Sequence, residues 1–414
     1  MRTRTRNALA ALVTGLMAVS MAGCGETEGE GEDGFTVGLL LPSSAVPRWE
    51  RFDRPLIEKR VKELCPHCKV AYANAADDAM NQRDQMNSLI TRGARVIILD
   101  AVDVKAMRSS VQAADRAHIP VVAYDRLAEG PISGFVSFDG TQVGRLQGKA
   151  LLEAMGDRAK GRRIVMMNGD PISPNTAWYR KGARSVLGDK VTIRKEYANL
   201  EWRAENAHDN MAAAISDLGA HRIDGVLAAN DAIASGVISA LKSARVSPLL
   251  PVTGQDADLD AVQRIVKGEQ TMTVYKSFER QADVAASMAV ALGHGRSVHA
   301  IATTTVDSPT TQDVPAVLLT PVPVTAGTIG RTLVRDKVYS IHEICTPKLR
   351  SACDRAGLTG PKKVTEPKKL TGPKKKEMGG DPGGVPARAG VARHLQAIRR
   401  RPGAPGRGTA APGR

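Results

Sequence analysis

Short apolar runs alternate with amphipathic segments along most of the chain, beginning at Phe35. In the first series we expect strands at residues 35–41, 69–73, 95–100 and 120–124. Apolar residues at helical spacing predict helices between them, at 48–64, 79–92 and 103–117. Strands that alternate with helices indicate a parallel sheet with right-handed crossovers, which belongs to the α/β class.

A second series of the same kind follows the first. We expect helices at 140–156, 175–187, 203–218, 231–243 and 257–267, and strands at 162–167, 191–197, 225–229, 251–254 and 271–275. Two such series predict two lobes, each a doubly wound parallel sheet, and a cleft between lobes is a common ligand site. A further helix at 277–293 and a strand near 316–319 come after both series.

Polar side chains follow several of the predicted strands. Asp256 and Lys276 come after the strands at 251–254 and 271–275, and open α/β sheets bind ligands at the carboxyl ends of their strands. Alternatively, the residues around Asp256 form a surface loop and Lys276 is solvated. Asp258 stands where the next helix begins, so we expect it to cap that helix.

Three more polar residues stand at strand ends. Asp125 and Arg126 follow the strand at 120–124, and Asn230 follows the strand at 225–229. A carboxylate beside a guanidinium can clamp neighbouring hydroxyl groups. From these residues alone, an ordinary salt bridge explains Asp125 and Arg126 equally well.

Several motifs resemble, in order, the D-xylose-binding periplasmic proteins of bacterial ABC sugar importers. They are AYDR (123–126), SFD (137–139), VGRLQGKAL (143–151), AAND (228–231), GQDADL (254–259), QTMTVYK (270–276) and DVPAVLLTPVPVT (313–325). The resemblance covers roughly residues 35–355. It implies a type I periplasmic binding protein, whose three-crossing hinge closes the lobes around a ligand, and such proteins are a known example of hinge closure.

The resemblance also implies the division of the chain. We expect the crossings near Asp139, Ser277 and Pro309. The N-terminal lobe then comprises 35–138 plus 277–308, and the C-terminal lobe comprises 139–276 plus 309–340. A C-terminal disulfide segment, 341–358, follows.

A monosaccharide presents hydroxyl groups and weakly apolar ring faces, so a specific site needs planar polar side chains and an aromatic wall. The resemblance implies that Arg48 and Trp49 form a matching Arg-Trp pair and that Trp202 is a wall residue. The full substrate-binding set that it implies is Arg48, Trp49, Asp125, Arg126, Asn175, Trp202, Asn230, Asp256 and Lys276. Partly exposed packing is the alternative for each tryptophan. Asn175 lies in the loop 169–176, which is the least similar to the family, and pentose discrimination could differ there.

The net charge of +15 is concentrated at the two ends of the chain. Residues 360–414 carry a net +11, and Arg2, Arg4 and Arg6 carry +3, so the remainder is nearly neutral. We therefore expect no nucleic-acid partner. Residues 359–414 combine many like charges with few apolar residues, which predicts a disordered basic tail. Two alternatives stay open for this tail. It binds an anionic wall polymer or lipid headgroups, or it is solvated and has no further role.

The N-terminus has the pattern of a secretory signal. A basic start and an apolar run at 8–19 precede small residues and Cys24, so we expect a signal peptide at 1–23. Residues 20–24 resemble a lipoprotein signal-peptidase site, which makes Cys24 the lipidated first residue of a tether at 24–34. Cleavage elsewhere, with loss of Cys24, is the alternative. The apolar run is too short to span a bilayer as a stable helix.

Four further cysteines form two local pairs, Cys65 with Cys68 and Cys345 with Cys353. An exported chain meets an oxidising setting, so we expect a disulfide in each pair. The Cys65–Pro66–His67–Cys68 motif also allows a redox site, half of a zinc site or free thiols.

Enzymatic motifs are absent from the sequence. No predicted strand is followed by GxGxxG or GxxxxGK[ST], and neither GxSxG nor HExxH occurs. We therefore expect no enzymatic activity, no cofactor and no metal.

The resemblance implies an extracytoplasmic lipoprotein, monomeric, that delivers a pentose, D-xylose above all, to the permease subunits of an ABC importer. Its place would be the outer face of the cell membrane or the periplasm. The alternative function is a sugar-sensing module that presents the closed form to a membrane kinase or chemoreceptor. A related sugar-responsive repressor would need an N-terminal helix-turn-helix, where this chain has a signal peptide.

Overall fold

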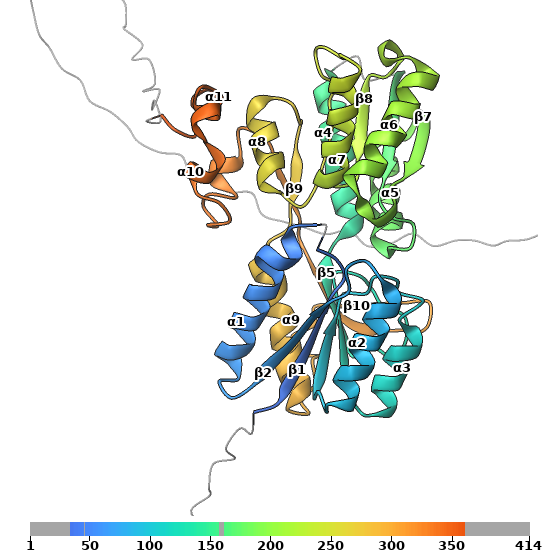
Figure 1. Cartoon of the computed structure of the whole chain (residues 1–414), viewed down its shortest axis with the longest axis vertical. Helices are drawn as coiled ribbons and strands as arrows, with labels where there is room; N and C mark the ends of the chain where they lie inside the picture. Colours follow the sequence, from blue (N-terminus) through green and yellow to red (C-terminus); the bar gives the residue numbers. More distant parts are fainter. Residues whose placement is uncertain (1–33, 45, 157–160, 361–414) are drawn as a thin grey trace, which may run out of the picture. The chain divides into compact units, whose positions relative to one another are not determined.

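The computed structural model describes residues 34–44, 46–156 and 161–360 (Figure 1). The predicted signal peptide, Cys24 and nearly all of the predicted basic tail lie outside the described residues. Across the described ranges, no helix has both the length and the apolar character that a membrane crossing requires.

A seven-stranded sheet in the order β10-β11-β5-β4-β3-β1-β2 forms the first lobe. Its parallel strands are β1 (Thr36–Leu41), β2 (Lys69–Asn74), β3 (Val96–Leu99), β4 (Val121–Tyr124), β5 (Gly134–Phe138) and β11 (Val314–Leu319), and β10 (Thr304–Val306) is antiparallel at one edge. The helices of this lobe are η1 (Trp49–Asp53), α1 (Arg54–Leu64), α2 (Ala79–Thr91), α3 (Arg108–Arg116) and α9 (Phe278–Gly293).

The burial of strand β1 on both faces explains why its sequence is almost wholly apolar. Val37, Leu39 and Leu41 pack into the hydrophobic cluster that contains residues of α1 and α9. Leu40 points to the other face, where residues of α2 and α3 form a second cluster. Helices therefore cover both faces of the sheet, as Figure 1 shows, and successive side chains of a central strand are all buried.

The second lobe is built on the parallel strands β7-β6-β8, which are Val191–Ala198, Arg162–Asn168 and Gly225–Ala228. Its helices are α4 (Gly140–Met155), α5 (Pro174–Leu187), α6 (Ala204–Leu218), α7 (Asp231–Ser243) and α8 (Leu259–Lys267). The strand predicted at 251–254 is reduced to a single bridge between Val252 and Val226. Strands β9 (Thr273–Tyr275) and β12 (Val322–Val324) form a separate antiparallel pair.

Helices α4 and α5 approach each other closely through glycines. A Cβ atom on Gly144 would lie 1.9 Å from the carbonyl oxygen of Tyr179, and one on Gly182 would lie 1.9 Å from that of Thr141. Only glycine permits this approach, which brings the backbones of α4 and α5 into close contact. The helix α5 also carries cavity residues, so this packing helps to position the candidate site.

The third crossing between the lobes lies later than the sequence predicts. Residues 314–319 pair with β5 in the first sheet, so the chain crosses between Leu319 and Val322 and not near Pro309. Residues 309–319 therefore belong to the first lobe, and the prediction that places them in the C-terminal lobe is wrong. Strands β5, β10 and β12 are not predicted by the sequence pattern.

Both local cysteine pairs form disulfides. Cys65–Cys68 closes the turn between α1 and β2, and it does not open a helix as a thioredoxin-like motif would. Cys345–Cys353 joins α10 (Ile341–Ile344) to α11 (Arg350–Arg355). Buried residues of this C-terminal segment share a hydrophobic cluster with α8, so the disulfide segment packs on that helix.

Candidate functional site

A cavity lies where the carboxyl ends of the strands meet. It is lined by Val46, Trp49, Asp125, Arg126, Ser173, Asn175, Tyr179, Trp202, Asn230, Gln255, Asp256 and Lys276. Eight of the nine sequence-predicted residues are in this set, and Arg48 is the exception. The free volume of the cavity is about 30 Å³, below the roughly 300–1,000 Å³ that small-molecule sites occupy, so the lining side chains must move apart to admit a sugar.

Two aspartates reach the cavity through unusual backbone. Asp125 follows β4 with φ 57°, and Asp256 has φ 92°. The Asp125 N–H donates to the carbonyl of Val136 and the Asp256 N–H to that of Val274, each at 2.9 Å. A left-handed backbone is uncommon outside glycine, and such strain collects at binding sites when the surrounding structure holds it in place.

These two carboxylates share the same pair of cations. The Lys276 Nζ lies 2.8 Å from the Asp256 Oδ1 and 3.8 Å from the Asp125 Oδ1. On the other side, the Arg48 Nη1 lies 3.6 and 3.7 Å from the same two oxygens. All four side chains are almost wholly buried.

Burial and charge act in opposite directions on the pKa values of this cluster. Burial alone would raise the pKa of Asp125, but the charges of Lys276 and Arg48 lower it below its usual value. Burial alone would lower the pKa of Lys276, but Asp256 raises it above its usual value. Asp125 and Lys276 therefore remain charged at neutral pH, which makes them strong partners for hydroxyl groups.

Arg48 lies beneath the cavity and not in its lining. Its guanidinium donates to Asp53 through Nε at 3.0 Å and Nη2 at 2.8 Å, and Nη2 also donates to the Gln281 Oε1 at 2.9 Å. Tyr124 donates to the same Asp53 carboxylate. Although burial lowers the pKa of Arg48, Asp53 and Asp125 raise it well above its ordinary value. Arg48 is thus a fixed cation that holds the carboxylates in position.

Arg126 is also held in position, by contacts with other residues of the first lobe. Its Nη1 donates to the carbonyl of Ala101 at 2.9 Å, and its Nε lies 3.5 Å from the Asp100 Oδ1. The pKa of Asp100 is raised well above its usual value because the carboxyl is completely buried.

Aromatic side chains form the walls. Trp49 and Trp202 are 3% and 8% exposed, and the rings of Tyr179 and Trp202 meet edge to face with centroids 6.3 Å apart. Trp178, the third tryptophan, lies instead against Phe135, with centroids 6.4 Å apart.

Five further polar atoms around the cavity are buried without a hydrogen-bond partner among the described residues. They are Trp49 Nε1, Ser173 Oγ, Asn175 Oδ1, Trp202 Nε1 and Gln255 Oε1. Leaving a buried polar group unpaired costs about 1–3 kcal/mol. Donors and acceptors are both present, so a ligand rich in hydroxyl groups would satisfy them.

Comparison with known proteins agrees with this geometry. Residues 37–297 match the family described as periplasmic binding protein domain. The chain belongs to this family. A relative, the D-xylose-binding periplasmic protein of Escherichia coli K12, is 31% identical over 347 residues, which cover 82% of this chain and 100% of the relative. The multiple sugar-binding periplasmic protein SbpA of Azospirillum brasilense is 32% identical over 330 residues, 75% of this chain and 91% of the relative.

Solved structures agree with the predicted fold. An ABC transporter solute binding protein from Clostridium phytofermentans with bound β-D-glucose superposes with a TM-score of 0.69 at 25% identity, covering 75% of this chain and 99% of that one. The prediction of a type I periplasmic binding protein with an α/β fold is confirmed.

Four residues that line the cavity of this binding protein were not among those predicted: Val46, Ser173, Tyr179 and Gln255. Local signals for three of them exist in the sequence. Gln255 directly precedes Asp256, and Ser173 shares a loop with Asn175. Tyr179 lies four positions after Asn175 on α5, so both occupy one face of that helix.

The expected capping role of Asp258 is wrong. Asp258 occupies the N-cap position of α8, but its side chain makes no capping hydrogen bond. Asp231 holds this turn instead, accepting hydrogen bonds from the Gln270 side chain at 2.7 Å, the Thr273 hydroxyl at 2.8 Å and the Asp258 N–H at 3.0 Å. Burial, followed by the charge of Asp256, raises the pKa of Asp258 to about 7.

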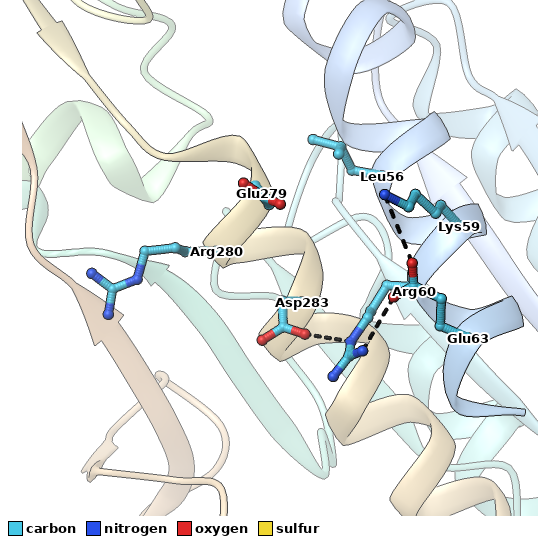
Figure 2. Close-up of a pocket in the computed structure, with 7 residues that line it drawn as sticks. All are labelled: Leu56, Lys59, Arg60, Glu63, Glu279, Arg280 and Asp283. Atoms are coloured by element: carbon cyan, nitrogen blue, oxygen red, sulfur yellow. Dashed lines mark hydrogen bonds and ion pairs between the residues drawn. The ribbon is translucent and has the colours of Figure 1, made fainter. Parts of the chain in front are cut away.

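A larger cavity lies between α1 and α9 of the first lobe (Figure 2). It has a free volume of about 380 Å³ and is lined by Leu56, Lys59, Arg60, Glu63, Glu279, Arg280 and Asp283. Arg60 forms ion pairs with Glu63 and Asp283, as Figure 2 shows. Among these described residues none is aromatic, so nothing there could stack on a sugar ring. The smaller cavity is therefore the better candidate for a ligand site.

Proposed function

We propose that this protein is an exported sugar-binding protein that delivers a pentose, D-xylose foremost, to the permease of an ABC importer. The observation that carries the proposal is the cavity itself. Charged Asp125 and Lys276 stand beside unpaired buried donors and acceptors, between tryptophan walls. The names of two relatives above 30% identity support the sugar, since they refer to D-xylose and to multiple sugars.

Closure of the lobes supplies the mechanism. Asp125 and Arg126 come from the first lobe, whereas Asn175 and Trp202 come from the second. The Asn175 Nδ2 donates to the Asp125 Oδ2 at 3.0 Å, which links the two lobes across the cavity. A sugar that contacts both lobes binds the closed form more tightly than the open form, so it shifts the population toward closure. The permease then recognises the closed monomer, and no chemical step is required.

Isothermal titration calorimetry tests the proposal. The purified protein is titrated with D-xylose, L-arabinose, D-ribose, D-glucose and D-galactose. We expect the tightest binding with D-xylose. If none of these sugars gave heat, sugar binding would be contradicted. If D-glucose bound more tightly than D-xylose, the pentose assignment would be wrong, but the assignment of a sugar site would remain.

One relative favours a second candidate function. A protein of Rhizobium radiobacter, 30% identical over 334 residues, is named a multiple sugar-binding periplasmic receptor. On this reading the closed form would be presented to a membrane sensor. Deletion of the gene separates the two functions, because loss of sugar uptake indicates import and loss of a sugar response with normal uptake indicates sensing.

We further propose that Cys24 carries a lipid that keeps the exported protein at the membrane. The sequence before Cys24 supports this, although the residue lies outside those the structure describes. The substitution Cys24→Ser should move the protein from the membrane fraction to the soluble fraction. Cys65→Ser is the control and should stay with the membranes. Persistence of the Cys24→Ser protein in the membrane fraction would contradict the lipid anchor.

A further inference from the structure

Gly169 lies at the end of β6, directly against the ring of Trp202. A Cβ atom built on Gly169 would lie 2.0 Å from the ring atom Cη2, 2.2 Å from Cζ3 and 2.5 Å from Cζ2. Side chains do not approach a Cβ atom so closely, and the φ of Gly169 lies outside the left-handed region. The tryptophan ring, and not the backbone conformation, therefore requires glycine here.

The next residue ties the same loop to the turn that carries Trp202. Asp170 is 5% exposed, and its Oδ2 accepts the Glu201 N–H at 2.6 Å. Glu201 and Trp202 both have left-handed backbone, with φ 54° and 58°. A buried carboxylate that accepts a backbone N–H stabilises such a turn, because the strained conformation is needed to make the bond.

Asn199 makes a second link. Its side chain and its backbone N–H both donate to the carbonyl of Asn168, at 2.7 and 3.2 Å. The Trp202 N–H then donates to the carbonyl of Asn199 at 3.2 Å. The turn is thus bonded to the chain on both sides of Gly169, which leaves the tryptophan ring little freedom to shift.

Asp170 also organises the opposite part of the cavity lining. Its carbonyl accepts the Ser173 N–H at 3.1 Å and the Thr176 hydroxyl at 2.6 Å. Its Oδ1 accepts the Ile172 N–H at 3.0 Å. The loop that carries Ser173 and Asn175 is therefore held by the same residue that holds the aromatic wall.

We propose that Gly169 and Asp170, which are outside the cavity lining, are positioning residues that set sugar affinity and selectivity through Trp202. The inference rests on the proposed function, since it requires a sugar that contacts Trp202. Gly169 sets how far the ring can recede from the cavity. Asp170 sets the spacing between that ring and the polar groups of Ser173 and Asn175, so it determines which ring substituents fit.

A double-mutant cycle tests the role of Gly169. Gly169→Ala should weaken binding of the tightest sugar by about tenfold or more, because the new methyl group displaces the ring that stacks on the ligand. A phenylalanine lacks the three outer ring atoms that the methyl group would meet. In a Trp202→Phe background, Gly169→Ala should therefore cost about twofold at most. Gly327→Ala is the control, because no heavy atom lies within 4 Å of that Cβ position.

The readouts are sugar affinities by calorimetry, the ratio between pentose and hexose affinities, and tryptophan emission. Wild-type affinity in the Gly169→Ala protein, or an equal loss in both backgrounds, would overturn the proposal for Gly169. If the unchanged protein binds no sugar, the proposed function fails. A shift in Trp202 emission, taken as the difference from Trp202→Phe, would still show whether Gly169→Ala moves the ring.

For Asp170, the comparison is between alanine and asparagine. Asp170→Ala removes the carboxylate that accepts the N–H groups of Glu201 and Ile172. It should therefore weaken sugar binding by about tenfold and change the ratio of pentose to hexose affinity. Asp170→Asn keeps one side-chain oxygen as an acceptor and should recover part of the affinity. Equal unfolding temperatures for the two variants, with different affinities, would exclude a purely structural role. An unchanged affinity and selectivity ratio in Asp170→Ala would overturn the proposal for this residue.

Discussion

Replacing Asp256 with alanine should weaken sugar binding by at least about tenfold. Hydrogen bonds to charged groups contribute roughly 1.5–3 kcal/mol, and each 1.4 kcal/mol changes a dissociation constant about tenfold. Among the described residues, the substitution leaves Lys276 with Asp125, at 3.8 Å, as its remaining carboxylate partner within 4 Å, in a site where Lys276 is 3% exposed. Calorimetry with the sugar that the unchanged protein binds most tightly measures the effect.

Asp258→Ala is the matched control. Asp258 is two residues away in the same turn, but it does not line the cavity, and its side chain makes no capping hydrogen bond. We expect its affinity to stay within about twofold of the unchanged protein. If Asp258→Ala abolished binding while Asp256→Ala did not, the assignment of Asp256 to the ligand would be wrong.

Replacing Arg48 with methionine should lower the free energy of unfolding by about 3–5 kcal/mol, because it leaves the buried carboxylate of Asp53 without its cation. The same substitution should weaken sugar binding, since Asp125 and Asp256 lose a shared positive charge. Urea unfolding at neutral pH measures the first effect, and calorimetry measures the second.

Arg51→Ala provides the comparison for Arg48. The Arg51 Nη2 lies 3.0 Å from the Glu343 Oε1, and the two side chains are 41% and 43% exposed. Exposed ion pairs contribute about 0–1 kcal/mol, so this substitution should change stability little. If Arg48→Met were as mild as Arg51→Ala, the buried ion pair of Arg48 with Asp53 would not stabilise the fold.

Local pattern was sufficient for most of the secondary structure. Central parallel strands are buried on both faces, so β1 and β4 read as unbroken apolar runs in the sequence. Helix α8 shows the helical spacing, and Gly268 ends it in a left-handed conformation with φ 81°. Asp256 and Lys276 were found because strand ends are visible locally and ligands bind at such ends. For Asp125, the family resemblance was needed to favour a ligand contact over an ordinary salt bridge.

Strand pairing over long distances could not be read in the same way. Strand β5 has five residues and begins with glycine, so its sequence carries a weak signal. Strand β11 joins the first sheet only because it pairs with β5, whose residues lie about 180 positions earlier in the chain. This pairing moved the third crossing from the predicted Pro309 to the stretch after Leu319.

The sequence by itself determined the class of fold and most of its elements, and with the family resemblance it predicted eight of the twelve residues that line the cavity. Only the tertiary structure decided that Arg48 lies beneath the cavity and that Gly169 touches the ring of Trp202. The physical reason is the range of the interactions. Apolar periodicity and strand ends depend on near neighbours in the chain, whereas burial of a cation and contact between a glycine and a ring depend on segments that folding brings together.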